Sequence, residues 1–225
     1  MGQIEINHTG SGGTVVLSSD GTDLLLGGTA IGGGGGGGAD LYAANEVSVT
    51  TQPSATGDDA VAIGDIATAT AANSMAIGHT ASTSGSFSVA FGRNASSTAN
   101  NAAAIGYNAT ASGTQSVALG DFSVASGSNA LAGPNSTASA TNSFALGQSA
   151  SASNFGGAAF GKGATTATNN YNVAIGNSYT SGEEAFAAAI ANNTSSYGAT
   201  GSNSIAMGDL AKATGSNGLA LGKNS

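Results

Sequence analysis

One segment of the chain has the spacing of a phosphate-binding loop, but it lacks the residue that such a loop needs for magnesium. Gly156 and Gly161–Lys162 fit the pattern G-x-x-x-x-G-K, yet Gly163 stands where Ser or Thr would meet the metal. Lys162 also follows a phrase that recurs along the chain and is usually followed by a polar residue. We interpret this segment as part of a repeat and expect no cofactor.

The other candidates for chemistry are two histidines and two acidic pairs. His8 and His79 are the only histidines, and neither belongs to a recognisable Ser-His-Asp arrangement. The carboxylates of Asp58–Asp59 and Glu183–Glu184 point to different sides of an extended chain, which favours solvated residues over a metal site or a paired-carboxylate glycosidase site. We therefore expect no catalytic residue, no bound metal and no enzyme activity, so a depolymerase is disfavoured.

A four-residue phrase dominates the sequence: an apolar residue, Ala, a second apolar residue and Gly. It recurs from Val61 to Gly222, for example as VAIG at 61–64, VALG at 117–120 and LALG at 219–222, with degenerate copies at 131–134 and 188–191. Most copies begin 14 residues apart, and the extremes are 13 and 17. Such a period predicts stacked identical units rather than one central core.

Each 14-residue unit can form two strands of about five residues and two short turns. Side chains alternate along a strand, so one face of the phrase is bulky and apolar while its Ala/Gly face is smooth. The pattern predicts an all-β parallel β-solenoid, or β-roll, of about twelve coils spaced by roughly 4.8 Å. Pro134 cannot donate a ladder hydrogen bond, and we expect a local distortion there with stacking on both sides.

The smooth Ala/Gly face is uncharged, and we expect another copy of the chain to cover it in a closed cyclic assembly. The residues expected to pack the coils and the assembly are Val61, Ile63, Ala76, Ile77, Val89, Phe91, Val117, Ala118, Leu119, Phe144, Leu146, Val173, Ile175 and Ile205.

Composition narrows the classes of partner. The 225-residue chain has a net charge of -8 with only four basic residues, which disfavours nucleic-acid binding. No apolar run is long enough to span a membrane, so we expect no membrane insertion. The 37 glycines raise the question of disorder, but 40% hydrophobic residues in a strict period argue against it.

The N-terminal residues 1–31 form a separate pattern of short alternating segments. We predict a small β module there, too small to bury a core alone, followed by a Gly-rich tether and transition at 32–59 and the repeat array at 60–225. The module would attach the protein to a partner through the apolar residues Ile4, Ile6, Val15, Leu17, Leu24 and Leu26.

The phrases resemble the head repeats of trimeric autotransporter adhesins, the YadA-like head family. Asn73–Gly78, Asn142–Gly147 and Asn203–Gly208 carry its Asn-Ser-Val-Ala-Ile-Gly pattern. The resemblance implies a left-handed parallel β-roll, a homotrimer and an adhesive role. The sequence shows no signal peptide, heptad stalk or membrane barrel of a whole adhesin, and residues 2–31 with the following polyglycine resemble leader modules of marine bacteriophage structural proteins.

Together the two resemblances predict a virion structural protein: a fibre, spike or capsid-decorating projection at the extracellular particle surface. Its N-terminus would bind other virion proteins, and its array would adhere weakly to a host-surface glycan or protein. A capsid cement protein and a bacterial surface adhesin head are the alternatives. Possible receptor contacts are Tyr171, Tyr179 and Tyr197, which lie in or near the longest repeat units.

Overall fold

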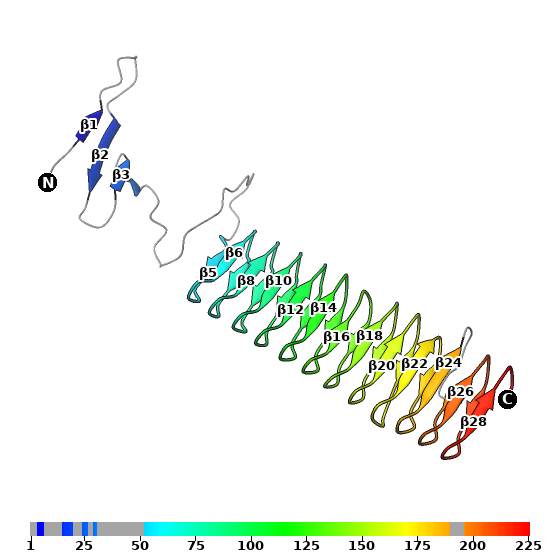
Figure 1. The fold of residues 1–225 in the computed structure, drawn as a ribbon. Helices are drawn as coiled ribbons and strands as arrows, with labels where there is room; N and C mark the ends of the chain where they lie inside the picture. Colours follow the sequence, from blue (N-terminus) through cyan, green and yellow to red (C-terminus); the bar gives the residue numbers. More distant parts are fainter. Residues whose placement is uncertain (1–3, 7–14, 20–23, 27–28, 31–51, 190–195) are drawn as a thin grey trace. The chain divides into compact units, whose positions relative to one another are not determined.

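The computed structural model describes residues 4–6, 15–19, 24–26, 29–30, 52–189 and 196–225. The chain divides into two units, Met1–Asp40 and Leu41–Ser225 (Figure 1). The polyglycine run at 32–38 lies outside the described residues. No helix that could cross a membrane occurs in the described ranges.

The first unit contains a four-stranded antiparallel sheet in the order β1-β2-β3-β4. Its strands are β1 (Ile4–Ile6), β2 (Val15–Ser19), β3 (Leu24–Leu26) and β4 (Thr29–Ala30). Ile4 pairs with Leu17, which pairs in turn with Leu26, and Ile6 pairs with Val15. The six apolar residues expected to serve attachment therefore all lie on strands, and five of them are paired with another of the six. Their attachment role stays a prediction.

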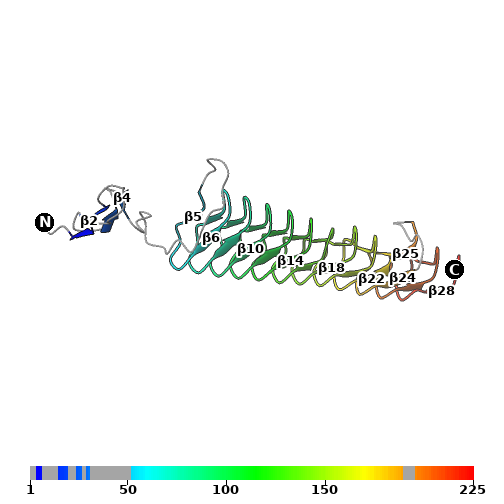
Figure 2. The same cartoon turned by 90° about the horizontal axis from the view of Figure 1, so that it is seen from above.

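The second unit is a parallel β-solenoid built from two twelve-stranded sheets (Figures 1 and 2). The phrase sheet, which carries the repeated phrase, consists of β6 (Val61–Ile63), β8 (Met75–Ile77), β10 (Val89–Phe91), β12 (Ala103–Ile105), β14 (Val117–Leu119), β16 (Leu131–Ala132), β18 (Phe144–Leu146), β20 (Ala158–Phe160), β22 (Val173–Gly176), β24 (Phe186–Ala189), β26 (Ile205–Met207) and β28 (Leu219–Leu221).

The opposite sheet, named the hydroxyl sheet for its many Ser and Thr residues, has shorter strands. They are β5 (Ser54–Ala55), β7 (Thr68–Ala69), β9 (Ser82–Thr83), β11 (Ser96–Ser97), β13 (Thr110–Ala111), β15 (Val124–Ala125), β17 (Thr137–Ala138), β19 (Ser151–Ala152), β21 (Thr165–Thr166), β23 (Tyr179–Thr180), β25 (Gly198–Ala199) and β27 (Lys212–Ala213).

The predicted all-β solenoid of about twelve coils is confirmed, and each phrase strand pairs in register with the phrases before and after it. Ala90, for example, pairs with Ala76 on one side and Ala104 on the other. The degenerate copy expected at 188–191 was placed two residues too late: Phe186 of β24 pairs with Val173 and with Ile205, so the phrase of this coil begins at Phe186. Two further expectations were wrong in detail. Most strands have two or three residues rather than five, because the corners take up most of the 14-residue unit. The solenoid also includes β5, which pairs with β7, so regular structure begins within the segment assigned to the transition.

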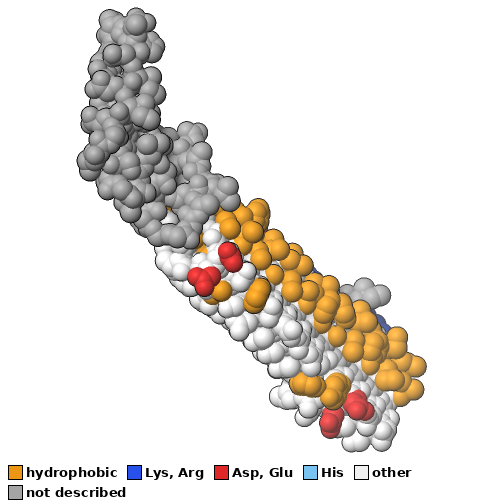
Figure 3. All heavy atoms as spheres, turned by 60° about the vertical axis from the view of Figure 1, so that its left-hand side comes forward, with side chains coloured by type: hydrophobic (Ala, Val, Ile, Leu, Met, Phe, Trp, Pro, Cys, Tyr) orange, Lys and Arg blue, Asp and Glu red, His pale blue; other side chains and the backbone are white. Residues whose placement is uncertain are grey.

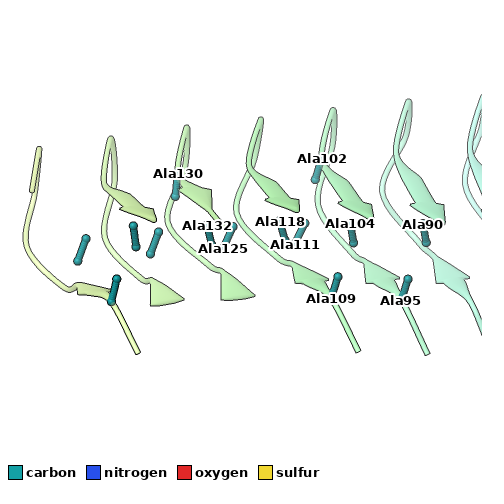
Figure 4. Close-up of a cluster of buried hydrophobic side chains, with 14 of the residues drawn as sticks. Ala90, Ala95, Ala102, Ala104, Ala109, Ala111, Ala118, Ala125, Ala130 and Ala132 are labelled. Carbon is teal, nitrogen blue, oxygen red and sulfur yellow. The ribbon is translucent and has the colours of Figure 1, made fainter. Parts of the chain in front are cut away.

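The interior of the coils is filled mainly by alanine, with Thr83, Ser97, Thr166 and Thr180 at the inward position of four hydroxyl-sheet strands. The second residue of the phrase, as in Ala76, Ala90 and Ala118, is 0% exposed within the single chain. Alanines of the hydroxyl sheet, such as Ala111, approach it from the other side (Figure 4). The expectation that another copy covers the alanine face was therefore wrong: the chain's own second sheet covers it, and the two sheets lie too close for larger side chains.

Two corners join the strands of each coil. The first corner follows a phrase strand, and the second corner precedes the next one. At the second corner, Asn73, Asn142 and Asn203 adopt φ values of 55–57°, a left-handed conformation that Asn tolerates. The serine that follows donates a hydrogen bond to the carbonyl three residues earlier, as Ser143 does to Ala140 at 2.6 Å. The Asn-Ser pair before the phrase thus encodes the second corner.

The degenerate phrase at Pro134 distorts one coil, as predicted. Its strand β16 has two residues, and Pro134 cannot donate the bond that Gly120 donates to Ile105 at 2.7 Å. The bonds on both sides persist, because Gly133 donates to Ala145 and Asn135 donates to Asp121, each at 2.8 Å. Strand β16 still pairs with β14 and β18, so stacking continues through the distortion.

Candidate binding surfaces

The most extensive candidate surface is an apolar stripe along the outer face of the phrase sheet (Figure 3). The first and third phrase residues point away from the alanine interior and are half-buried or exposed in the single chain; Phe91 is 53% exposed and Leu119 is 41% exposed. The stripe contains Val61, Ile63, Ile77, Val89, Phe91, Val117, Leu119, Phe144, Leu146, Val173, Ile175 and Ile205 from the predicted packing set. Of that set, Ala76 and Ala118 alone lie inside the coil.

The hydroxyl sheet presents a different outer face. Its first strand residue points outward and is mostly Thr or Ser, as in Thr68, Ser82 and Thr110, each of which is half-buried. The Thr68 hydroxyl donates to that of Ser82 in the next coil at 3.2 Å. The solenoid therefore has one apolar and one hydroxylated outer face. Burial of the apolar face in an interface would release more free energy than burial of the hydroxylated face.

The first corner carries a row of polar and charged residues. His79 Nε2 lies 3.3 Å from Asp65 Oδ2, and the Asp121 carboxylate accepts a bond from the Tyr107 amide at 3.1 Å. The Arg93 guanidinium lies 5.7 Å from the centre of the Tyr107 ring. Tyr107 also meets Phe122 edge to face, with ring centres 5.2 Å apart. These residues thus interact with one another from coil to coil.

The second corner carries a different aromatic pair. Phe155 and Tyr171, from consecutive coils, have ring centres 5.4 Å apart at an interplanar angle of 90°. Tyr171 is 55% exposed and Phe155 is 38% exposed. The next coil places Glu183 and Glu184, both exposed, at the equivalent positions of this corner. In the sequence, Phe155 and Tyr171 are two separate aromatic residues outside the phrase, and their contact becomes visible only when the coils are stacked.

The structure separates the three tyrosines proposed as receptor contacts. Tyr171 lies at the second corner, whereas half-buried Tyr179 begins β23 of the hydroxyl sheet. Tyr197, also half-buried, directly precedes β25, the strand that pairs with β23. Tyr179 and Tyr197 thus lie on neighbouring coils, and Tyr171 belongs to a different surface.

The remaining candidates for chemistry do not form a site. Asp58, Asp59, His79 and Lys162 are exposed corner residues. Within the described ranges, no three His, Asp or Glu side chains lie close enough together to hold a metal ion. His8 lies outside those ranges.

The repeats match a known family. The family model described as "YadA head domain repeat (2 copies)" matches residues 55–81, 69–95, 84–109, 97–123, 111–132, 125–150 and 199–225, which together cover more than half of the chain. A search of curated proteins found no match.

Proposed function

Because the chain belongs to the YadA head domain repeat family, we propose that it forms a homotrimeric, non-enzymatic adhesin-like shaft. The observation that carries the proposal is the apolar stripe. Twelve strands spaced by roughly 4.8 Å and about 10 Å wide give it a nominal area of about 500 Å², near the upper end for an uncovered patch on a monomer. A trimer with this stripe at its centre removes it from water.

The assembly must use the stripe rather than the alanine face. Alanine positions are already filled within each chain, so they have no surface to offer a partner. The stripe, in contrast, contains protruding Phe, Leu, Ile and Met side chains in adjacent coils, and Phe144 and Phe160 already pack at 5.3 Å. Closed rotational symmetry would bury equivalent stripes without leading to open-ended polymers.

Light scattering on the full-length protein tests the trimer. The expected mass is three times the 21.1 kDa of the chain. Leu119→Lys should dissociate it, because symmetry would bring three unpaired charges into the apolar centre. Thr110→Lys is the matched control on the hydroxyl sheet, where Lys212 naturally occupies the equivalent position, and it should remain trimeric. A wild-type monomer at micromolar concentration would contradict the proposal.

We further propose that the shaft projects from a virion, with the β1–β4 sheet attached to other virion proteins and the array directed to the host surface. Support comes from the separate N-terminal unit and its alternating apolar residues. A bacterial surface adhesin head agrees equally well with the family match. A capsid cement protein is the third candidate. Labelling the protein on intact particles and on bacterial cells decides among them.

A further inference from the structure

We propose that the exposed Phe155–Tyr171 pair is the binding site for an uncharged saccharide. This inference rests on the adhesin-like role proposed above and adds the place and the class of ligand. Residues that recur in every coil are needed for the fold. Exposed residues that depart from the repeat are not needed for the fold, and they are therefore candidates for binding. At the second corner, the pair breaks the repeat in three ways.

The first departure is the residue type at Tyr171. Its φ is 59°, in a row of left-handed residues that includes Asn101, Asn129 and Asn142. A bulky side chain is unfavourable in this region, and among the described residues of this row only Phe87 and Tyr171 are aromatic. The ring also buries little apolar area in the coil, because Tyr171 is more than half exposed to solvent.

The second departure is Gly156, which occupies the row position one coil before Tyr171. A Cβ atom there would lie 2.8 Å from Cδ1 of Tyr171. The ring therefore rests against the bare backbone of the preceding coil, while its other neighbour is the Phe155 ring. Fixed on two sides, Tyr171 is a rigid platform that loses little entropy when a ligand stacks on it.

The third departure is an extra residue. The coil from Ala158 to Val173 has 15 residues rather than 14, and its corner is tied to both neighbours by side-chain amides. The Asn154 amide donates to the Asn169 carbonyl, and the Asn169 amide donates to the Ser181 carbonyl at 2.5 Å. An enlarged corner held by its own hydrogen bonds presents the rings without becoming loose.

Polar groups beside the rings suit sugar hydroxyls. The Glu184 amide donates to the Asn170 carbonyl at 3.0 Å, so the acidic pair lies one coil beyond the rings. Figure 3 shows a small hydrophobic patch beside acidic side chains toward the C-terminal end of the array, apart from the long stripe. The exposed Glu183 and Glu184 carboxylates can accept bonds from hydroxyls, while an aromatic face stacks on the C–H face of a pyranose.

Charge and size select the ligand. The chain carries a net charge of -8, and the two glutamates lie one coil beyond the rings, so anionic saccharides are repelled. Two rings cover far less than the roughly 800 Å² per partner of a standard protein interface, which favours one or two sugar units over a folded partner. The Tyr107–Phe122 pair is a weaker candidate, because Arg93 already covers Tyr107.

Ligand-observed NMR titrations of the full-length protein test the site with cellohexaose, mannohexaose and N-acetylchitohexaose, and with hexagalacturonate as the anionic comparison. At least one neutral hexasaccharide should bind the wild type. Tyr171→Asn restores the residue typical of the row, so the fold should be kept while affinity falls about tenfold or more from the loss of one stacking ring. Phe87→Asn removes another exposed ring of the same row and should leave binding unchanged.

Light scattering and thermal melting of each variant accompany the titrations. The proposal is overturned if no neutral hexasaccharide binds, if only hexagalacturonate binds, or if Tyr171→Asn binds like the wild type. It is also overturned if Tyr171→Asn loses the trimer, because the rings are then a subunit contact. Failure of the proposed function looks different: the wild type itself would be monomeric, whatever its sugar binding.

Discussion

At the scale of single residues, the repeat works because each position has one physical task. Asn accepts the left-handed corner, Ser closes it with a hydrogen bond to a backbone carbonyl, and Ala fills the interior. The largest fully buried side chains are Asn172 and three threonines, so nothing bulkier is enclosed in the described coils. Whether a position tolerates a larger side chain therefore depends on whether it points into the coil or out of it, even when both positions hold alanine.

Two identical substitutions should separate inward from outward positions. Ala118→Leu overpacks a fully buried position and should lower the free energy of unfolding by about 3 kcal/mol or more. Ala103→Leu places the same side chain on the outer face between Val89 and Val117, where it should be neutral or stabilising. Denaturant unfolding of the two variants measures the difference. Equal stabilities would show that Ala118 is not enclosed by its own coil.

At the scale of the coil, stacking requires glycine at the end of the phrase. Gly106 has a φ of 137°, and a Cβ atom there would lie 2.5 Å from the carbonyl carbon of Gly120 in the next coil. The constraint thus has two parts: a backbone conformation that L-residues resist, and a backbone of the next coil that leaves no space. Gly78, Gly92 and Gly208 meet both in the same way.

The last coil allows the two parts to be measured separately. Gly222 has a φ of 101° but nothing within 4 Å of its added Cβ. Gly222→Ala should cost about 1–2 kcal/mol for backbone strain, whereas Gly106→Ala should cost clearly more, because it adds the clash. Thermal melting followed by circular dichroism compares them. A Gly106→Ala variant as stable as Gly222→Ala would contradict this account of the stacking.

At the scale of the whole molecule, the proposed functions fall to different units. The solenoid stacks twelve coils in register and carries the Phe155–Tyr171 pair on its surface. The proposed trimer would therefore present three copies of this pair. A trimer raises the effective concentration of individually weak sites, which suits adhesion. The β1–β4 sheet has four short strands, too few to bury a core alone, which agrees with its proposed attachment to a partner.

For the virion projection proposed above, deletion of residues 1–38 should leave a trimeric, folded array that no longer joins the particle. The stripe and all 24 strands of the two long sheets lie beyond the deletion, so light scattering and circular dichroism should report an intact shaft. Copy number on purified virions measures attachment. Incorporation at the normal level would mean that the array itself binds the particle, and the cement role would replace the projection.

The sequence by itself determined the number of coils, their parallel stacking and the corners, because a 14-residue period with Gly, Asn and Ser at fixed places permits little else. It also showed that the phrase has two faces. Which face lies inside could not be read from the alternation, since both faces are uncharged. The tertiary structure decided it: the two sheets of each coil lie so close that only small side chains fit between them, and the bulky ones must point out. Stacking likewise created the Phe155–Tyr171 pair from residues 16 positions apart in sequence.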